Sequence, residues 1–273
     1  MLDDDRRGGD EARLVLYTFA LSHFSEKIRW TLGLAALPFD EVMWTPFFHV
    51  LKARTRGRAT TVPVLQTSDG PVQDSTRILR WLEKHRAPFA LLPEASAERD
   101  EALAVEATFD DVGSQVVRYV YSEALDQTEN VVRYWTVAAT PWETRVVTRL
   151  FPVMRWIFRR KLGVSPSKVA RAKDTIDRGL SFLEERVSLE KPYLVGERLT
   201  VADVTAAALL APLACPNEHP IYGSARYRDG LRSLVAPFAD RPGLAWVREM
   251  YRRHRGTFPR AQEIRRKLDA APM

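Results

Sequence analysis

The stretch Ser22-His23-Phe24-Ser25-Glu26-Lys27-Ile28-Arg29-Trp30 decides the fold of this chain. It follows the apolar run 14–19, which is typical of a buried strand, and it opens an amphipathic pattern that is typical of a helix. Two serines therefore stand three residues apart in the first turn of a helix that follows a strand. A redox-active Cys-x-x-Cys pair would be expected there, and the serines exclude such a dithiol. A helix N-terminus can nevertheless hold a thiolate that belongs to a ligand.

Strand and helix signals alternate through the rest of the first third of the chain. Helical patterns cover 25–36 and 75–85, a turn signal stands at 68–70, and strand patterns cover 14–19, 39–44, 62–65 and 71–73. The segment 45–60 is irregular or partly helical and is rich in basic residues. This order predicts an α/β unit built around one sheet.

Everything after the proline-rich stretch 88–95 has helical patterns. One clear helical pattern begins at 96, and three others cover 170–187, 200–213 and 244–255. The pattern over 200–213 is apolar almost all round, as a core helix is. The expected organisation is therefore a disordered leader over 1–12, an α/β domain over 13–87, a linker over 88–95, and an all-helical domain over 96–273 with an extended insertion around 119–166.

Composition narrows the class of protein. The chain has 273 residues, of which 45% are hydrophobic and 28% are charged, and this is typical of a soluble globular protein. It has a single cysteine, Cys215, and five scattered histidines, so we expect no structural disulfide, no metal site and a cytoplasmic location. The net charge of +6 allows attraction to anions, but no nucleic-acid motif is present, and nucleic acid is not expected as a partner.

Three positions carry candidate chemistry. Val62-Pro63 begins a strand, where proline is tolerated; a cis bond there would turn the Val62 backbone outward toward an extended ligand, whereas a trans edge proline is the more common arrangement. Asp74-Ser75 precedes a helix. Ser75 is a natural N-cap, and together the two residues could hold the ammonium and carboxylate of an α-amino acid.

Ser22 is the third. No Ser-His-Asp arrangement is evident that would make it a nucleophile, but its hydroxyl can donate a hydrogen bond to a bound thiolate. Such a bond contributes about 1.5–3 kcal/mol, which lowers a thiol pKa by about one or two units.

These motifs, in this order, resemble the thioredoxin-like domain of the glutathione transferase superfamily. The resemblance extends to Thr200-Val201-Ala202-Asp203, which is similar to the N-capping box of the family's core helix, with Thr200 capping and Asp203 returning the bond. It implies an α/β thioredoxin-like N-terminal domain followed by an all-α C-terminal domain. It also implies that Val62-Pro63 is cis.

The resemblance assigns roles residue by residue. Ser22 takes the catalytic position that assists the glutathione thiolate, the Val62 backbone pairs with the cysteinyl unit beside Pro63, and Asp74 and Ser75 bind the γ-glutamyl end. Further candidates have other assigned places: Tyr17 is the alternative catalytic residue, Phe24 packs under the thiol, His23 is exposed near the ligand, Ser25 is a helix-start serine, and His49 meets the glycyl carboxylate. Lys27 and Arg29 are expected to be structural or solvated.

The insertion departs from the family pattern. Residues 145–161 place arginines on one side of a helical wheel and apolar residues on the other. An outer helix of the second domain is the favoured interpretation, and a helix lying on an anionic membrane surface is the alternative. Pro152 predicts a break or kink. Aromatic residues are numerous here and could roof an apolar acceptor pocket: Tyr119, Tyr121, Tyr134, Trp135, Trp142 and Phe151.

The sequence thus predicts an enzyme, a homodimer, that conjugates the thiolate of its co-substrate glutathione to a small apolar electrophile, with Ser22 stabilising the thiolate. The alternative is a non-catalytic module of the same fold that binds or scaffolds, which is open because fold alone does not imply turnover. A second alternative is a membrane-peripheral protein that uses 145–161.

Overall fold

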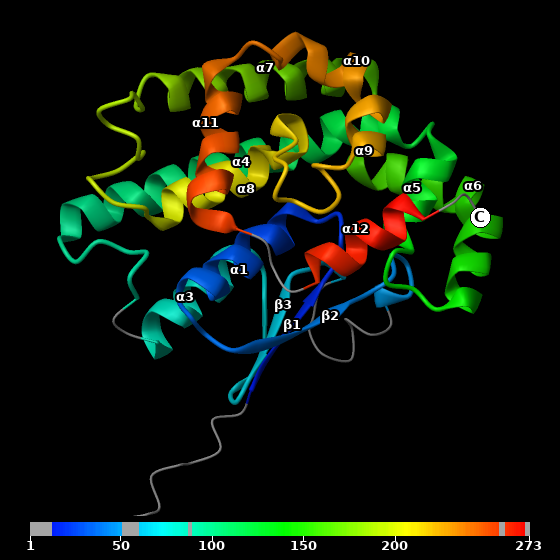
Figure 1. The fold of residues 1–273 in the computed structure, drawn as a ribbon, viewed down its shortest axis with the longest axis horizontal. Helices are drawn as coiled ribbons and strands as arrows, with labels where there is room; N and C mark the ends of the chain where they lie inside the picture. Colours follow the sequence, from blue (N-terminus) through cyan, green and yellow to red (C-terminus); the bar gives the residue numbers. More distant parts are fainter. Residues whose placement is uncertain (1–12, 51–59, 87–88, 257–259, 271–273) are drawn as a thin grey trace, which may run out of the picture.

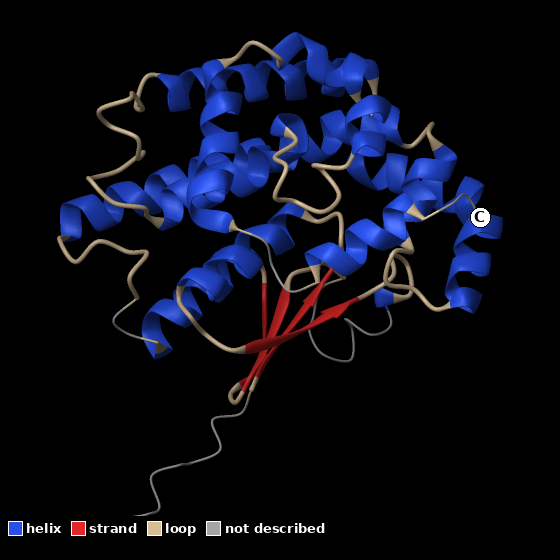
Figure 2. Ribbon diagram, in the orientation of Figure 1, coloured by secondary structure: helices blue, strands red, loops and turns tan. Residues whose placement is uncertain are grey.

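The computed structural model describes residues 13–50, 60–86, 89–256 and 260–270. The predicted leader over 1–12 and most of the basic segment between the second and third strands lie outside these ranges. Strands occupy only the first part of the chain, and helices make up the rest (Figures 1 and 2). The predicted fold class, a thioredoxin-like α/β domain followed by an all-helical domain, is confirmed.

The first domain is built on a four-stranded mixed sheet in the order β2-β1-β3-β4. Its central strand β1 (Leu14–Thr18) runs parallel to β2 (Phe39–Met43) and antiparallel to β3 (Val64–Thr67), and β3 pairs with β4 (Gly70–Gln73). Helices α1 (His23–Leu34) and α3 (Ser75–His85) pack beside it. The apolar run that begins at Leu14 is central in the sheet, and this explains its near-continuous hydrophobicity.

The second domain is a helical layer above the sheet (Figure 2). Its helices are α4 (Ser96–Ala124), α5 (Thr128–Trp135), α6 (Pro141–Leu162), α7 (Pro166–Glu184), α8 (Val201–Ala214), α9 (Ala225–Gly230), α10 (Arg232–Val235), α11 (Pro242–Met250) and α12 (Ala261–Asp269). None of the helices among the described residues is long and apolar enough to cross a membrane.

Helix α8 is buried along its whole length and packs against α1, α4 and α11. Its start is the predicted capping box: the Thr200 amide donates to Asp203 at 2.8 Å, and the Ala202 amide donates to the Thr200 hydroxyl at 3.2 Å. Close approach to α4 requires Gly113, because a Cβ there would lie 2.8 Å from a Leu209 methyl carbon. The predicted core helix and its cap are confirmed.

A break or kink is predicted at Pro152. Helix α6 runs through Pro152 without interruption, so the break is wrong. Proline removes the amide that would bond the carbonyl of Thr148. Both residues are exposed, so water can satisfy that carbonyl. The helix is fixed at its start by a second capping box, between Thr140 and Glu143.

Candidate functional site

The loop between β1 and α1 places Ser22 at the start of α1 as its N-cap. The backbone amide of Ser25 donates to the Ser22 Oγ at 3.1 Å, which leaves the hydroxyl hydrogen of Ser22 available to a ligand. The side chain of Ser25 is fully buried, and its hydroxyl has no hydrogen-bond partner among the described residues. Of the two serines, Ser22 is therefore the one that presents a hydroxyl outward.

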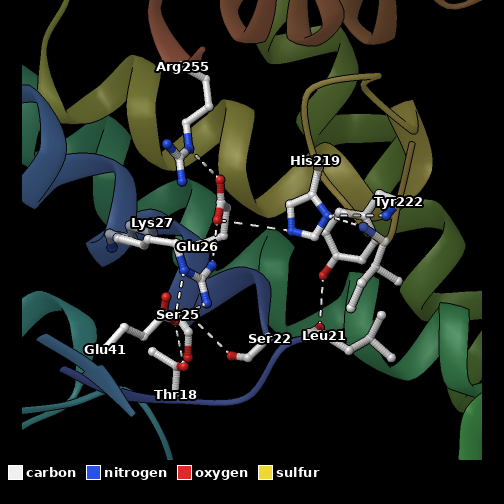
Figure 3. A network of polar contacts seen from close by, with 12 residues as sticks. Thr18, Leu21, Ser22, Ser25, Glu26, Lys27, Glu41, His219, Tyr222 and Arg255 are labelled. Atoms are coloured by element: carbon white, nitrogen blue, oxygen red, sulfur yellow. Dashed lines mark hydrogen bonds and ion pairs between the residues drawn. The ribbon is translucent and has the colours of Figure 1, made fainter. Parts of the chain in front are cut away.

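A buried ion network lies behind this loop and holds α1 to the rest of the molecule (Figure 3). Glu26 is completely buried and accepts hydrogen bonds from Arg29 at 2.5 Å and from Arg255 at 2.6 Å. Burial alone would raise the pKa of Glu26, but Arg255 and Arg29 outweigh it and lower the pKa to about 2. The Glu26–Arg255 pair links the first domain to the segment that follows α11.

Arg29 extends the network into the sheet. Its guanidinium also donates to Glu41 of β2 at 2.6 and 2.9 Å, and Thr18 at the end of β1 donates to the same carboxylate at 2.7 Å. The expectation that Lys27 and Arg29 are structural or solvated is met on the structural side, because both side chains are almost fully buried in ion pairs. The carboxylates keep Arg29 charged despite its burial and raise its pKa.

The second domain also fixes the loop directly. The hydroxyl of Tyr222 donates to the backbone carbonyl of Leu21 at 2.8 Å, one residue before Ser22 (Figure 3). His219 lies flat against the Tyr222 ring, with ring centroids 3.9 Å apart, and its Nδ1 accepts the amide of Tyr222 at 3.1 Å. Burial lowers the pKa of His219 to about 3, so the ring is neutral at pH 7.

A second buried cluster joins the domains on the other side of α1. Lys27 donates to Glu106 at 2.5 Å and to Asp110 at 2.6 Å, and Thr76 donates to the same two carboxylates. Burial and Glu106 raise the pKa of Asp110, against the effect of Lys27. Both α1 and the first turn of α3 are thereby anchored to α4.

A cavity of about 400 Å³ opens in front of Ser22. Its first wall comes from the β1–α1 loop, from the segment after β2 and from the chain before β3, and its second wall comes from α4, α5 and α6. The residues that line it are mostly apolar: Phe19, Ala20, Leu21, Ser22, His23, Phe24, Pro46, Phe47, His49, Val50, Thr60, Thr61, Val62, Val117, Tyr121, Tyr134, Trp135, Ile157, Phe158, Lys161 and Leu162.

Five of the predicted site residues line this cavity: Ser22, His23, Phe24, His49 and Val62. The remaining predicted residues lie outside its lining. Tyr17 is buried on the other side of the strand, where its ring stacks on Trp44 at 4.6 Å. This placement favours Ser22 over Tyr17.

Val62 and Pro63 lie just before β3, and the bond between them is cis. The ladder between β1 and β3 ends at Val64, so Val62 stands beyond the last pair of that ladder. The backbone amide of Asp74 donates to the carbonyl of Pro63 at 3.3 Å, which brings the start of α3 beside the cavity wall.

The prediction that Ser75 is the N-cap of this helix is wrong. The cap is Asp74, whose carboxylate accepts the amide of Arg77 at 3.2 Å, and Ser75 is the first helical residue. Asp74 holds a left-handed backbone (φ 86°), which places its exposed carboxylate over the helix start. Ser75 is buried.

Two histidines in the cavity wall are neutral. His23, predicted to be exposed, is 3% exposed because its Nε2 donates to the Gly113 carbonyl of α4 at 3.1 Å, and burial lowers its pKa to about 4. His49 donates through Nε2 to the carbonyl of Thr60 at 2.9 Å, and burial likewise lowers its pKa to about 4. Its buried Nδ1 can accept a hydrogen bond but not donate one in this tautomer.

Aromatic side chains from the insertion roof the cavity. Trp135 donates through its indole nitrogen to the Tyr121 hydroxyl at 3.2 Å, and the Phe158 ring lies 5.3 Å from the ring of Trp135 and 5.0 Å from that of Tyr121. Burial raises the pKa of Tyr121 to about 12, so this hydroxyl stays protonated. Of the aromatic residues suggested for the roof, Tyr121, Tyr134 and Trp135 line the cavity and Tyr119, Trp142 and Phe151 do not.

Sequence reasoning did not find the residues that brace the loop from the second domain, namely His219, Tyr222 and Arg255. Their contacts with α1 and its loop span about 200 positions, and no local pattern signals them. Phe158 was assigned only to an apolar helix face. Among the described residues, no group of three or more metal-ligating side chains is close enough to hold a metal ion.

Solved structures with related folds include glutathione S-transferases from Methylobacterium radiotolerans and Methylobacillus flagellatus. The first, a complex with glutathione sulfonate, is 23% identical, with a TM-score of 0.54 over 85% of this chain and 93% of its own. The second, with GSH bound, is 17% identical, with a TM-score of 0.59 over 95% and 100%. A beta-etherase from Sphingobium is 21% identical, with a TM-score of 0.54 over 86% and 98%.

Sequence comparison gives a curated relative and two family matches. Elongation factor 1-gamma of Artemia salina is 31% identical over 102 residues, which are 36% of this chain and only 23% of that protein. Residues 16–89 match the glutathione S-transferase N-terminal domain, and residues 146–221 match the glutathione S-transferase C-terminal domain. With both domain types matched in order and the corresponding fold, the chain belongs to the glutathione S-transferase superfamily.

Proposed function

We propose that this protein binds glutathione in the cavity in front of Ser22 and transfers its thiolate to an apolar electrophile. One observation carries the proposal: a hydroxyl at a helix N-terminus and a large aromatic pocket share a single cavity. A polar thiolate site and an apolar acceptor site in direct contact are what such a transfer needs. The solved structures that contain glutathione or glutathione sulfonate support glutathione as the ligand.

Ser22 stabilises the thiolate in this proposal. Its Oγ already accepts the Ser25 amide, and its own hydrogen points to the ligand sulfur while the dipole of α1 favours negative charge. A hydrogen bond to a charged acceptor contributes about 1.5–3 kcal/mol, so the thiol pKa falls by about one or two units from about 8.5. The neutral histidines of the wall are weak bases, so the thiol proton leaves to solvent.

The rest of glutathione extends along the first wall. The cysteinyl unit pairs with the Val62 backbone beside Pro63, and the γ-glutamyl end reaches the start of α3. Asp74 would bind the ammonium group there, and the helix start with Ser75 would bind the carboxylate. The hydrogen bond from Asp74 to Pro63 supports this path, since it joins the helix start to the cavity wall.

The electrophile occupies the aromatic roof formed by Tyr121, Trp135 and Phe158. The thiolate attacks the electrophilic carbon, a carbon–sulfur bond forms, and the displaced group leaves with its electron pair. In an addition reaction the new carbanion takes a proton from water instead. Lys161 at the cavity wall supplies positive charge near the acceptor. Assembly as a homodimer is part of the proposal, and light scattering tests it.

A non-catalytic module is the second candidate function. The match to elongation factor 1-gamma, whose name indicates a translation factor and not a transferase, favours it. A non-catalytic module would either bind glutathione without conjugating it or neither bind nor conjugate it.

The test is glutathione binding by calorimetry together with conjugation of 1-chloro-2,4-dinitrobenzene followed by absorbance. For the enzyme, Ser22→Ala lowers kcat about 10- to 100-fold with little change in glutathione affinity, which is the loss of about 1.5–3 kcal/mol. Ser25→Ala is the matched control and leaves kcat unchanged, because its hydroxyl has no partner. Binding without turnover in the wild type would favour the second candidate.

A further inference from the structure

The outward face of α6 carries an exposed apolar stripe. Five large apolar side chains of this one helix are exposed: Trp142 (57%), Leu150 (46%), Val153 (58%), Trp156 (62%) and Ile157 (41%). At about 100° per residue, they fall within about a third of the helix circumference. In the remainder of the described chain, the large apolar side chains that are exposed are Val42 and Leu189. The stripe is therefore a concentrated feature and not general surface composition.

The inward face of the same helix shows that the stripe is not needed for packing. Val147, Phe151 and Met154 are buried and form a local core with α5 and its neighbours. Helix α6 lies at the right-hand edge of the molecule in Figure 1, and α5 packs against its inner side. Trp142 makes an edge-to-face contact with Phe48, with ring centroids 5.1 Å apart, and the other four side chains of the stripe remain exposed.

Beyond Glu143, which belongs to the capping box at the start of α6, the charge around the stripe has one sign. From Thr144 to Lys173 the sequence has no aspartate or glutamate, and it has nine cations: Arg145, Arg149, Arg155, Arg159, Arg160, Lys161, Lys168, Arg171 and Lys173. Two of them, Arg155 and Arg159, pair with Asp126 on another side of the helix. Arg149 and Arg160 share the sector of the stripe and have no ion pair with any described residue.

We propose that this face of α6 docks on an anionic lipid surface. The tryptophan, valine and leucine side chains enter the boundary between headgroups and acyl chains, and the arginines bind lipid phosphates. Trp156 suits this position because tryptophan is enriched at bilayer interfaces, and the Arg160 guanidinium lies over its ring, 5.8 Å from the centroid.

Charge complementarity separates a lipid surface from a second copy of the chain. A symmetric contact through this face would bring Arg149 and Arg160 against the same arginines of the other copy, with no acid between these positions to compensate. An anionic bilayer supplies the missing negative charge. The inference does not depend on catalysis, because docking needs neither glutathione nor Ser22.

The docking face continues into the cavity wall. Ile157 belongs to both, since it is exposed in the stripe and also lines the cavity, and Phe158, Lys161 and Leu162 follow it along the wall. An apolar molecule dissolved in the bilayer would therefore meet the cavity rim directly. This arrangement would deliver membrane-partitioned acceptors to the proposed thiolate site.

Vesicle co-sedimentation of the full chain tests the proposal. We expect binding to phosphatidylcholine vesicles that contain ~30 mol% phosphatidylserine, little binding to pure phosphatidylcholine, and release as salt rises from about 0.1 M to about 1 M. Val153→Ser with Trp156→Ser removes the apolar contact and should lower the partition coefficient about 10-fold or more. Arg149→Gln with Arg160→Gln should lower it by a similar factor at low salt.

Matched controls separate this face from general effects. Leu189→Ser removes an exposed apolar side chain elsewhere on the surface. Arg80→Gln with Arg178→Gln removes two exposed positive charges, one from α3 and one from α7. Both controls should bind vesicles as the wild type does. All the changes are on exposed side chains, and thermal melts verify folding.

Equal binding to neutral and anionic vesicles, no binding to either, or unchanged binding of the α6 variants would overturn the proposal. Light scattering without lipid gives a further result that contradicts it: a dimer that Val153→Ser with Trp156→Ser converts to monomer would show that a second copy covers this face.

Discussion

Glu26 and Asp126 each hold two arginines, and the two carboxylates differ in burial. Glu26 is fully buried between Arg29 and Arg255 behind the Ser22 loop. The side chain of Asp126 is 61% exposed, and the two arginines of α6 that it contacts are 40% and 37% exposed. When one member of a buried ion pair is removed, water cannot solvate the charge that remains, whereas at an exposed ion pair it can. The buried Glu26–arginine pairs therefore stabilise the Ser22 loop, whereas the exposed Asp126–arginine pairs contribute little to the stability of the insertion.

The largest expected effect is at the buried carboxylate. Glu26→Gln removes the carboxylate that Arg29 and Arg255 share. Arg29 keeps Glu41, but the buried Arg255 loses this counter-charge, so we expect a loss of about 3–5 kcal/mol in the free energy of unfolding. Urea denaturation at pH 7 measures it. A loss below about 1 kcal/mol would mean that this network does not brace the loop.

The same carboxylate predicts an acid dependence of stability. Its pKa is about 2 in the folded protein and 4.5 in the unfolded chain, so the unfolded state binds the proton first. Its contribution is present above pH 4.5 and is lost as the pH falls toward 2. The difference in unfolding free energy between wild type and Glu26→Gln should shrink across that window, and a constant difference would contradict the assignment.

Buried His23 predicts a second pH dependence of the free energy of unfolding, at higher pH than that of Glu26. Its pKa of about 4 lies below the ordinary 6.5, so the unfolded state takes up the proton first and stability falls as the pH drops from 6.5 to 4. Each such histidine adds a slope of up to about 1.4 kcal/mol per pH unit. His23→Gln keeps a donor for the Gly113 carbonyl and should reduce the measured slope by about that amount. An unchanged slope would show that His23 is exposed to solvent.

Tyr222 tests the brace on the loop itself. Tyr222→Phe removes one hydroxyl and leaves the buried Leu21 carbonyl without its donor, so we expect a loss of about 1–3 kcal/mol in stability. We also expect kcat to fall while glutathione affinity holds, because Ser22 follows Leu21 directly. A variant with lower stability and unchanged kcat would make Tyr222 purely structural.

The smallest expected effect is at the exposed carboxylate. Asp126→Asn should change the free energy of unfolding by less than about 1 kcal/mol, and the change should vanish at high salt. A loss close to that of Glu26→Gln would remove the contrast between the two regions.

The sequence predicted what depends on local pattern. The strand before Ser22, the helix it caps and the Thr200–Asp203 capping box all arise from residues close together in the chain. It could not predict that His23 is buried, because that depends on the carbonyl of Gly113, 90 positions away. Nor could it separate Asp74 from Ser75 as the cap, since both residue types cap helices and the backbone of Asp74 decides.

The insertion shows the limit of a helical wheel. The wheel placed seven apolar residues on one core-facing side, namely Val146, Val147, Leu150, Val153, Met154, Ile157 and Phe158, but of these only Val147 and Met154 are buried. Leu150, Val153 and Ile157 remain exposed, because the neighbouring elements cover only a narrow strip of the helix. How wide a strip is covered depends on tertiary contacts, which periodicity does not contain.

The pKa of bound glutathione tests the central claim most directly. Thiolate absorbance is titrated against pH in the wild type, Ser22→Ala and Ser25→Ala, each saturated with glutathione. We expect a thiol pKa about one to two units below 8.5 in the wild type and in Ser25→Ala, and a return toward 8.5 in Ser22→Ala. An unshifted pKa in the wild type, or the same low pKa in Ser22→Ala, would contradict the account.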